Sequence, residues 1–97
     1  MKLEYRKLDD KEIAVALAEL PDWVLEAGEL ARTFSFGSYA AGVMFAAAVG
    51  QVADAMDHHP DLTIGYQKLR VSMHTHSVGG ISPYDFELAR RINRLVR

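Results

Sequence analysis

The chain has 97 residues, a net charge of −2 with neutral histidines, and no cysteine. This length suits a modest core, so we expect a single domain spanning residues 1–97. The acidic balance argues against a nucleic-acid binder, which needs a basic patch to neutralise phosphates, and the lack of cysteine excludes disulfides, thiolate nucleophiles and cysteine-based zinc sites.

The N-terminal third of the chain predicts a helix followed by two strands. Asp9 or Asp10 can cap the start of the helix, and Pro21 ends it. Residues 23–26 and 30–36 then read as two strands around a short turn. The helix carries apolar residues at spacings of four and three on one face: Ile13, Leu17 and Leu20.

The middle of the chain predicts a long apolar helix over residues 39–56. Ser38 supplies an N-cap, and Pro60 prevents the helix from continuing past residue 59. Many of its residues are Gly or Ala, so another backbone can approach it closely. Its longest apolar run, residues 39–49, is too short to span a bilayer, and residues 1–7 lack the apolar core of a signal peptide. We therefore expect a cytoplasmic protein without membrane contact.

The last third of the chain predicts two more strands and a final helix. Alternating apolar residues indicate strands over 62–66 and 69–75. Ser82 followed by Pro83 is typical of an N-cap and a first helical residue. The pattern predicts an α+β fold, a four-stranded antiparallel sheet with three helices packed on one face (α-β-β-α-β-β-α).

All four histidines lie between residues 58 and 76. His58 and His59 lie where the long helix ends. His74 and His76 are two residues apart, so an extended strand places both on the face opposite its apolar residues. Pairing of the last two strands would bring the two groups to one pocket. Because imidazole gives and takes protons near neutral pH, this cluster indicates acid/base elimination of water from a flat substrate.

Two carboxylates are candidates for orienting these imidazoles. Asp85 lies in the first turn of the final helix, and Asp54 lies one helical turn before His58 and can bond to it. Each residue also has a purely structural interpretation. Asp85 can stabilise the dipole of its helix, and Asp54 can be an ordinary solvated helix residue. The His58–His59 pair can bond to the free carbonyls at a helix end, and Trp23 can be a core residue.

A metal site is the main alternative to acid/base catalysis. His74 and His76, together with His58 or His59, supply enough nitrogen ligands for zinc or another ion that prefers imidazole. The spacing of these residues does not exclude such a site. This alternative predicts a metal-binding protein or a metalloenzyme.

The residues around the histidines resemble the signature of the pterin-4a-carbinolamine dehydratases. The resemblance extends over most of the chain from about residue 20 onward. It implies the same α-β-β-α-β-β-α fold, without cofactor or metal. It also implies dehydration of 4a-hydroxytetrahydropterin to quinonoid dihydropterin, a step of tetrahydrobiopterin recycling. The motifs that carry it are Asp54-x-x-x-His58-His59-Pro60, Tyr66, Thr75-His76, Gly80 and Asp85, with flanking matches at Trp23, Arg32-x-Phe34-x-Phe36, Tyr39, Phe45, Val49 and residues 82–93.

The resemblance also implies a role for each site residue. His58 and His76 would be the acid/base pair acting on the 4a-hydroxyl, and His59 would bind and polarise the pterin. Asp85 would hold the His76 side of the site, and Trp23 would close the pocket. The residues expected to line the pterin are Asp57, His58, His59, His74, Thr75, His76 and Ser77.

Members of this family are homodimers or homotetramers, which suits the small-residue helix over 39–56. Relatives also include a dimerisation cofactor of a homeodomain transcription factor and Rubisco assembly factors with degraded histidine sites, so a non-catalytic role is a further alternative. The presence of His58, His59, His76 and Asp85 favours an enzyme. His74 replaces a small hydroxyl residue that is common in the family, a change that can alter substrate preference.

Overall fold

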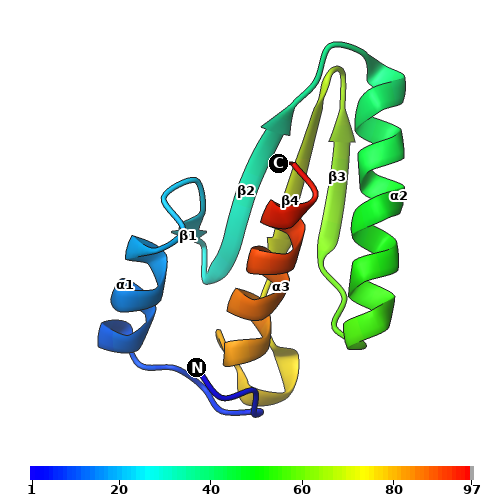
Figure 1. The fold of residues 1–97 in the computed structure, drawn as a ribbon. Helices are drawn as coiled ribbons and strands as arrows, with labels where there is room; N and C mark the ends of the chain where they lie inside the picture. Colours follow the sequence, from blue (N-terminus) through cyan, green and yellow to red (C-terminus); the bar gives the residue numbers. More distant parts are fainter. Residues whose placement is uncertain (97) are drawn as a thin grey trace.

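The computed structural model describes residues 1–96, which form three α-helices, a short 3-10 helix and one four-stranded antiparallel sheet (Figure 1). This order confirms the α-β-β-α-β-β-α prediction. The elements are α1 (Asp10–Ala18), β1 (Val24–Glu26), β2 (Glu29–Ser35), α2 (Tyr39–Met56), β3 (Asp61–Gly65), β4 (Lys68–Met73), η1 (His76–Val78) and α3 (Pro83–Arg94).

The sheet interleaves strands from both halves of the chain in the order β1-β2-β4-β3. Leu30 of β2 lies opposite Met73 of β4, and Leu62 of β3 lies opposite Val71 of β4. Because side chains alternate along a strand, one face of the sheet collects the apolar residues and packs against the helices. The buried residues that the two central strands contribute to this face are Leu30, Phe34, Leu69, Val71 and Met73.

The pairing of β3 with β4 decides where the histidines lie. These strands are antiparallel, with Asp61 opposite Ser72, so the start of β3 lies beside the end of β4. Residues 58–60, which precede β3, and residues 74–76, which follow β4, therefore lie at the same end of the sheet. Figure 1 shows this end at the bottom, where α2 ends and the loop before α3 turns back.

Each of the three α-helices begins at a capping residue that the sequence predicts. The carboxylate or hydroxyl oxygen of each cap accepts a backbone N–H of the first turn, which satisfies one of the free donors of a helix start. The N–H of Glu12 donates to Asp9 at 2.8 Å, that of Ala41 to Ser38 at 3.1 Å, and that of Tyr84 to Ser82 at 3.2 Å.

The end of the first helix differs from the prediction. Pro21 was expected to end it, but α1 stops at Ala18. The chain tightens there, because the backbone N–H of Leu20 donates to the carbonyl of Leu17 at 2.9 Å, three residues back. Leu20 still reaches the core, where only 6% of its surface is exposed.

Helix α2 is unusually apolar for a helix that is largely exposed. It is the one helix within residues 1–96 that is long and apolar enough to cross a membrane, with a mean hydropathy of 1.3 over 18 residues. A single helix of this kind is weak evidence for a membrane span, because core helices of soluble proteins have the same composition. The buried residues of α2 recur every three or four positions on one side of the helix: Gly42, Ala46, Val49 and Ala53.

Candidate active site

The end of α2 directs His58 inward. Asp57 adopts a left-handed conformation, with φ 51° and ψ 42°, and caps the helix. Its backbone N–H donates to the carbonyl of Asp54, and that of His58 donates to Ala53, both at 3.1 Å. This pair of bonds is typical of a helix end that reverses the chain. Because Pro60 follows, the chain leaves the helix here and enters β3.

His58 and Asp85 form a buried hydrogen-bonded pair. His58 Nε2 lies 2.7 Å from Asp85 Oδ1. Only 8% of His58 is exposed and none of Asp85 is. An ionised carboxylate can only accept, so beside ionised Asp85 the hydrogen is on Nε2, and Nδ1 of the neutral ring is an acceptor. Such charge-assisted bonds in a buried setting hold a ring firmly in one orientation.

The two oxygens of Asp85 together tie three segments of the chain, and Oδ1 already holds His58. Oδ2 accepts the Thr75 hydroxyl at 2.7 Å and the backbone N–H of Ser82 at 2.9 Å. Since the Thr75 proton goes to the carboxylate, Ser82 Oγ donates to Thr75 Oγ1, at 2.7 Å. Asp85 therefore bonds directly to His58 and reaches the His76 segment through Thr75, the residue before it. The Thr75 side chain, expected to line the pterin, faces this buried network instead.

His59 pairs with the other carboxylate. Its Nε2 lies 2.9 Å from Asp54 Oδ1, and both side chains are largely exposed. The sequence suggested that Asp54 would bond to His58, and this expectation is wrong. The left-handed residue Asp57 turns His58 towards α3, so His59 takes the position beside Asp54.

His76 lies on a short, closed loop. Thr75 and Gly80 bridge across it, with the N–H of Thr75 donating to the carbonyl of Gly80 at 2.8 Å. Gly79 adopts φ 68°, a conformation that suits glycine, and lets the loop close. His76 and His74 are exposed, and their ring centroids lie 6.2 Å apart at an interplanar angle of 64°.

The remaining predicted ligand residues divide between the surface and the core. Asp57 and Ser77 are exposed next to the histidines. Trp23 is 3% exposed, and its Nε1 donates to Asn93 Oδ1 at 2.8 Å, an oxygen that also accepts from Arg32 at 2.7 Å. Trp23 thus anchors the end of α3 in the core rather than facing a pocket.

An aromatic pair that sequence reasoning missed lies beside His58. The Tyr84 ring lies 5.9 Å from that of His58, and Tyr5 stacks on Tyr84 at 4.4 Å. Sequence position next to Asp85 was the one available signal for Tyr84. No local pattern pointed to Tyr5, because its contact depends on how the N-terminal segment folds back.

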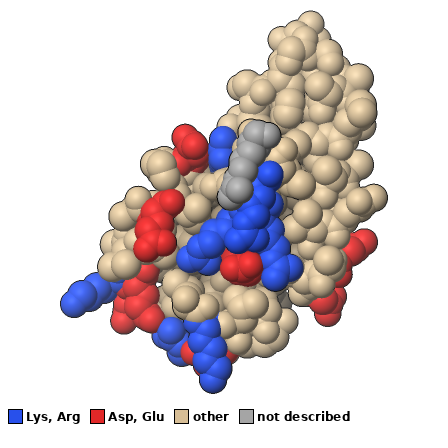
Figure 2. Space-filling view, viewed as in Figure 1, with Lys and Arg blue, Asp and Glu red and all other residues tan. Residues whose placement is uncertain are grey.

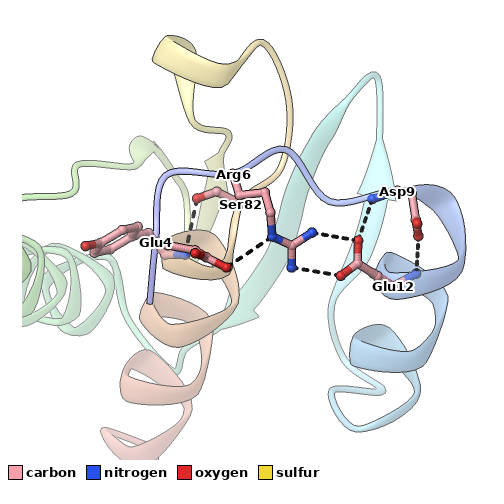
Figure 3. Close-up of polar contacts among 6 residues, drawn as sticks. Glu4, Arg6, Asp9, Glu12 and Ser82 are labelled. Carbon is pink, nitrogen blue, oxygen red and sulfur yellow. Dashed lines mark hydrogen bonds and ion pairs between the residues drawn. The ribbon is translucent and has the colours of Figure 1, made fainter. Parts of the chain in front are cut away.

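Arg6 clamps this N-terminal segment to α1 (Figure 3). Its guanidinium donates to both carboxylate oxygens of Glu12, at 3.0 and 2.8 Å, and to Glu4 at 3.2 Å. The hydrogen bonds from Arg6 lower the pKa of Glu12 to about 2, and the two carboxylates raise the pKa of Arg6. Because Arg6 directly follows Tyr5 in the chain, these bonds also fix the backbone beside Tyr5.

The alternative hypothesis, a metal site, requires at least three ligand side chains close together. Within residues 1–96, no group of three His, Asp or Glu side chains is arranged to hold an ion. Two of the imidazoles instead direct Nε2 to a carboxylate as a hydrogen-bond partner.

Two hollows of the surface lie apart from the histidines. One of about 400 Å³ lies between α1 and α3, and one of about 220 Å³ lies beside Gly79 and Gly80. Neither is lined by a histidine. The hydrogen-bond network, rather than a cavity, therefore identifies the candidate site.

Comparison with known proteins gives consistent matches over nearly the whole chain. A family model described as pterin 4 alpha carbinolamine dehydratase matches residues 6–95. A relative from Sulfolobus acidocaldarius is 42% identical over 89 residues, covering 92% of this chain and 98% of its own. One from Streptomyces coelicolor is 44% identical over 89 residues, covering 91% and 88%. Both carry the name "Putative pterin-4-alpha-carbinolamine dehydratase".

Two solved structures are also similar. A transcriptional coactivator/pterin dehydratase from Brucella melitensis superposes with a TM-score of 0.88 at 28% identity, covering 95% of this chain and all of its own. A pterin dehydratase-like protein described as a RuBisCO assembly factor of the alpha-carboxysome gives a TM-score of 0.60 at 22% identity, covering 75% and 84%. The second likeness extends to the fold alone.

Proposed function

The chain belongs to the pterin-4a-carbinolamine dehydratase family, and from this we propose that it is a hydro-lyase that converts 4a-hydroxytetrahydropterin to quinonoid dihydropterin and water. The observation that supports this most strongly is the buried bond between His58 and Asp85, which Thr75 connects to the segment that carries His76. The buried carboxylate thus holds one imidazole in place, and imidazole is a side chain that transfers protons near neutral pH.

The reaction needs two proton transfers and no change of oxidation state. A proton goes to the 4a-hydroxyl oxygen, the carbon–oxygen bond breaks, and water leaves. The N5 nitrogen supplies the electron pair of the new double bond and loses its proton. Two imidazoles on the same substrate can perform both transfers. We assign His58 and His76 to this acid/base pair.

The carboxylates support these imidazoles in different ways. Asp85 fixes His58 Nε2 as a donor, so Nδ1 is available as the proton acceptor, and the buried carboxylate stabilises positive charge when the ring is protonated. His59, held by exposed Asp54, is proposed to bind and polarise the pterin. The pterin-lining residues of the proposal are Asp57, His59, His74 and Ser77, with the backbone of Thr75.

Stopped-flow dehydration of freshly generated 4a-hydroxytetrahydrobiopterin tests this proposal. We expect the wild type to accelerate water loss above the uncatalysed rate, and H76A to lower kcat by about 100-fold or more. Because His76 is exposed, H76A should keep the wild-type circular dichroism spectrum, and K11A on α1 serves as an activity control. Equal turnover by H76A and the wild type would defeat the assignment. An inactive wild type would instead favour an assembly or dimerisation role.

We also propose that the protein acts in tetrahydrobiopterin recycling, as a cytoplasmic homodimer or homotetramer formed through α2. The outward face of this helix is apolar, with Met44 72% and Val43 39% exposed. Small residues such as Ala40 and Ala47 lie on the same exposed side, so a second copy can approach closely. Figure 2 shows no charged side chain over the upper part of α2. A surface of this kind is typical of contact between protein copies.

A further inference from the structure

Glu29 lies next to His74 in the sheet, although the two residues are far apart in sequence. Leu30 of β2 is paired with Met73 of β4. One step outward along both strands, Glu29 and His74 are therefore opposite each other, on the face of the sheet away from the helices. Glu29 Oε1 lies 4.0 Å from His74 Nδ1. Neither the motifs nor the spacing of the sequence pointed to Glu29.

One oxygen of Glu29 is buried and unpaired. Within residues 1–96, Oε1 has no hydrogen-bond partner, although the side chain as a whole is 32% exposed. A buried acceptor without a donor is costly, so folded proteins rarely keep one without a reason. The ring nitrogen of His74 is a suitable donor, and at 4.0 Å it lies about 1 Å beyond the usual hydrogen-bond distance.

His74 connects this carboxylate to the candidate site. Its ring stands edge-on to that of His76, with centroids 6.2 Å apart. An acceptor at Nδ1 decides which ring nitrogen carries the hydrogen, and so decides what the other nitrogen offers to a ligand.

We propose that Glu29 is a positioning residue that accepts the Nδ1–H of His74, so that His74 Nε2 is presented beside His76 as an acceptor for an N–H group of the pterin. This inference rests on the proposed dehydratase function. Through this bond, Glu29 and His74 would favour substrates that carry an N–H donor on the side facing His74. Neither residue takes part in the proton transfers to the 4a-hydroxyl.

Steady-state kinetics of single and double variants test the coupling. We expect H74A to raise KM about fivefold, the effect of one lost hydrogen bond, and to leave kcat within about twofold of the wild type. E29A should raise KM by a similar factor, and the double variant should equal H74A because Glu29 acts through His74. E29Q, which keeps an acceptor oxygen, should restore most of the affinity.

Glu26 offers a matched control. It lies opposite Glu29 across β1 and β2, but its carboxylate is paired with Arg70 at 2.6 Å. E26Q is expected to leave KM and kcat unchanged. A KM for H74A equal to that of the wild type, or additive effects of E29A and H74A, would overturn the proposal while leaving dehydratase activity intact.

Nitrogen-15 NMR of histidine side chains gives a readout that does not depend on turnover. In the substrate-free wild type, neutral His74 is expected as the Nδ1–H tautomer, and E29A should move it towards the Nε2–H form. The same tautomer distribution in both proteins would contradict the proposed contact. This measurement tests the Glu29–His74 contact even if the wild type lacks dehydratase activity. Failure of this inference can therefore be told apart from failure of the proposed function.

Discussion

Two histidine–carboxylate pairs have the same chemistry and very different surroundings. His58–Asp85 is buried, and the carboxylate also accepts from Thr75 and Ser82. His59–Asp54 lies in solvent. In water, an ion pair adds little stability, whereas removing one partner of a buried pair leaves polar groups without bonds. The two pairs should therefore respond differently to the loss of the carboxylate.

Removal of each carboxylate tests this contrast. We expect D85A to lower the free energy of unfolding by about 3 kcal/mol, because His58 and the Thr75 hydroxyl lose their buried acceptor. D54A should lower it by less than about 1 kcal/mol. Urea denaturation followed by circular dichroism measures both. Similar losses in the two variants would contradict the difference in environment.

The Arg6–Glu12 pair makes a pH-dependent contribution. The pKa of Glu12 is lowered from 4.5 to about 2 in the folded chain, so its stabilising effect is present above pH 4.5 and is lost as the pH falls towards 2. We expect the urea midpoint of E12Q to lie slightly below that of the wild type at pH 7, and the difference to shrink as the pH falls from 4.5 towards 2. The pair is exposed, so the effect should be small and should weaken with salt. A difference at pH 2 as large as that at pH 7 would contradict this explanation.

At the scale of elements, the end of α2 determines which histidine enters the core. Asp57 adopts a positive φ of 51°, which is costly for most residues with a side chain but tolerated by Asp and Asn. That one conformation separates buried His58 from exposed His59. Substitution at Asp57 therefore probes the turn itself.

Two variants of Asp57 should move stability in opposite directions. D57G removes the steric cost of the left-handed conformation and is expected to raise the free energy of unfolding by up to about 1 kcal/mol. D57V, with its branched side chain, should lower it by about 1–2 kcal/mol. Thermal and urea denaturation compare them. Equal stability of the two variants would show that the turn does not depend on this residue's φ.

Local signals in the sequence predicted the elements well. Ser82 and Pro83 marked the start of α3, and Pro60 marked the end of α2, because caps and proline act within one turn of the chain. The end of α1 was missed, since Leu20 is held in the core beyond the helix. No local pattern reveals the sign of φ at Asp57.

The candidate site was predictable only as far as its local motifs reached. Alternating apolar residues predict the strands that flank the histidines, and the expected α+β fold pairs them antiparallel, as β3 and β4 do. The partners of the carboxylates depend on side-chain direction and on contacts between distant segments. The Glu29–His74 contact requires the register of β2 against β4, which no stretch of sequence contains by itself.

At the scale of the whole molecule, the exposed apolar side of α2 is the main feature left without a partner within residues 1–96. Met44 is the most exposed large apolar residue on this helix. A charge placed there would be desolvated in an interface but harmless in water. Replacement of Met44 thus separates an interface from an ordinary exposed surface.

Light scattering coupled to size exclusion tests the proposed assembly. We expect the wild type to be a dimer or tetramer at micromolar concentration and M44E to shift towards the monomer, with the helix content unchanged. V15E, at an exposed apolar position of α1, is the matched control and should keep the wild-type mass. A monomeric wild type would end the proposal of assembly through α2.

The central claim is that imidazoles from two separate segments act on one ligand. Titration of protein carrying nitrogen-15 histidine with 7,8-dihydrobiopterin, followed by NMR of the ring nitrogens, tests it most directly. The ring signals of His58, His59 and His76 should shift together and give one dissociation constant. Shifts confined to one of the two segments, or no shift at saturating ligand, would contradict a shared site.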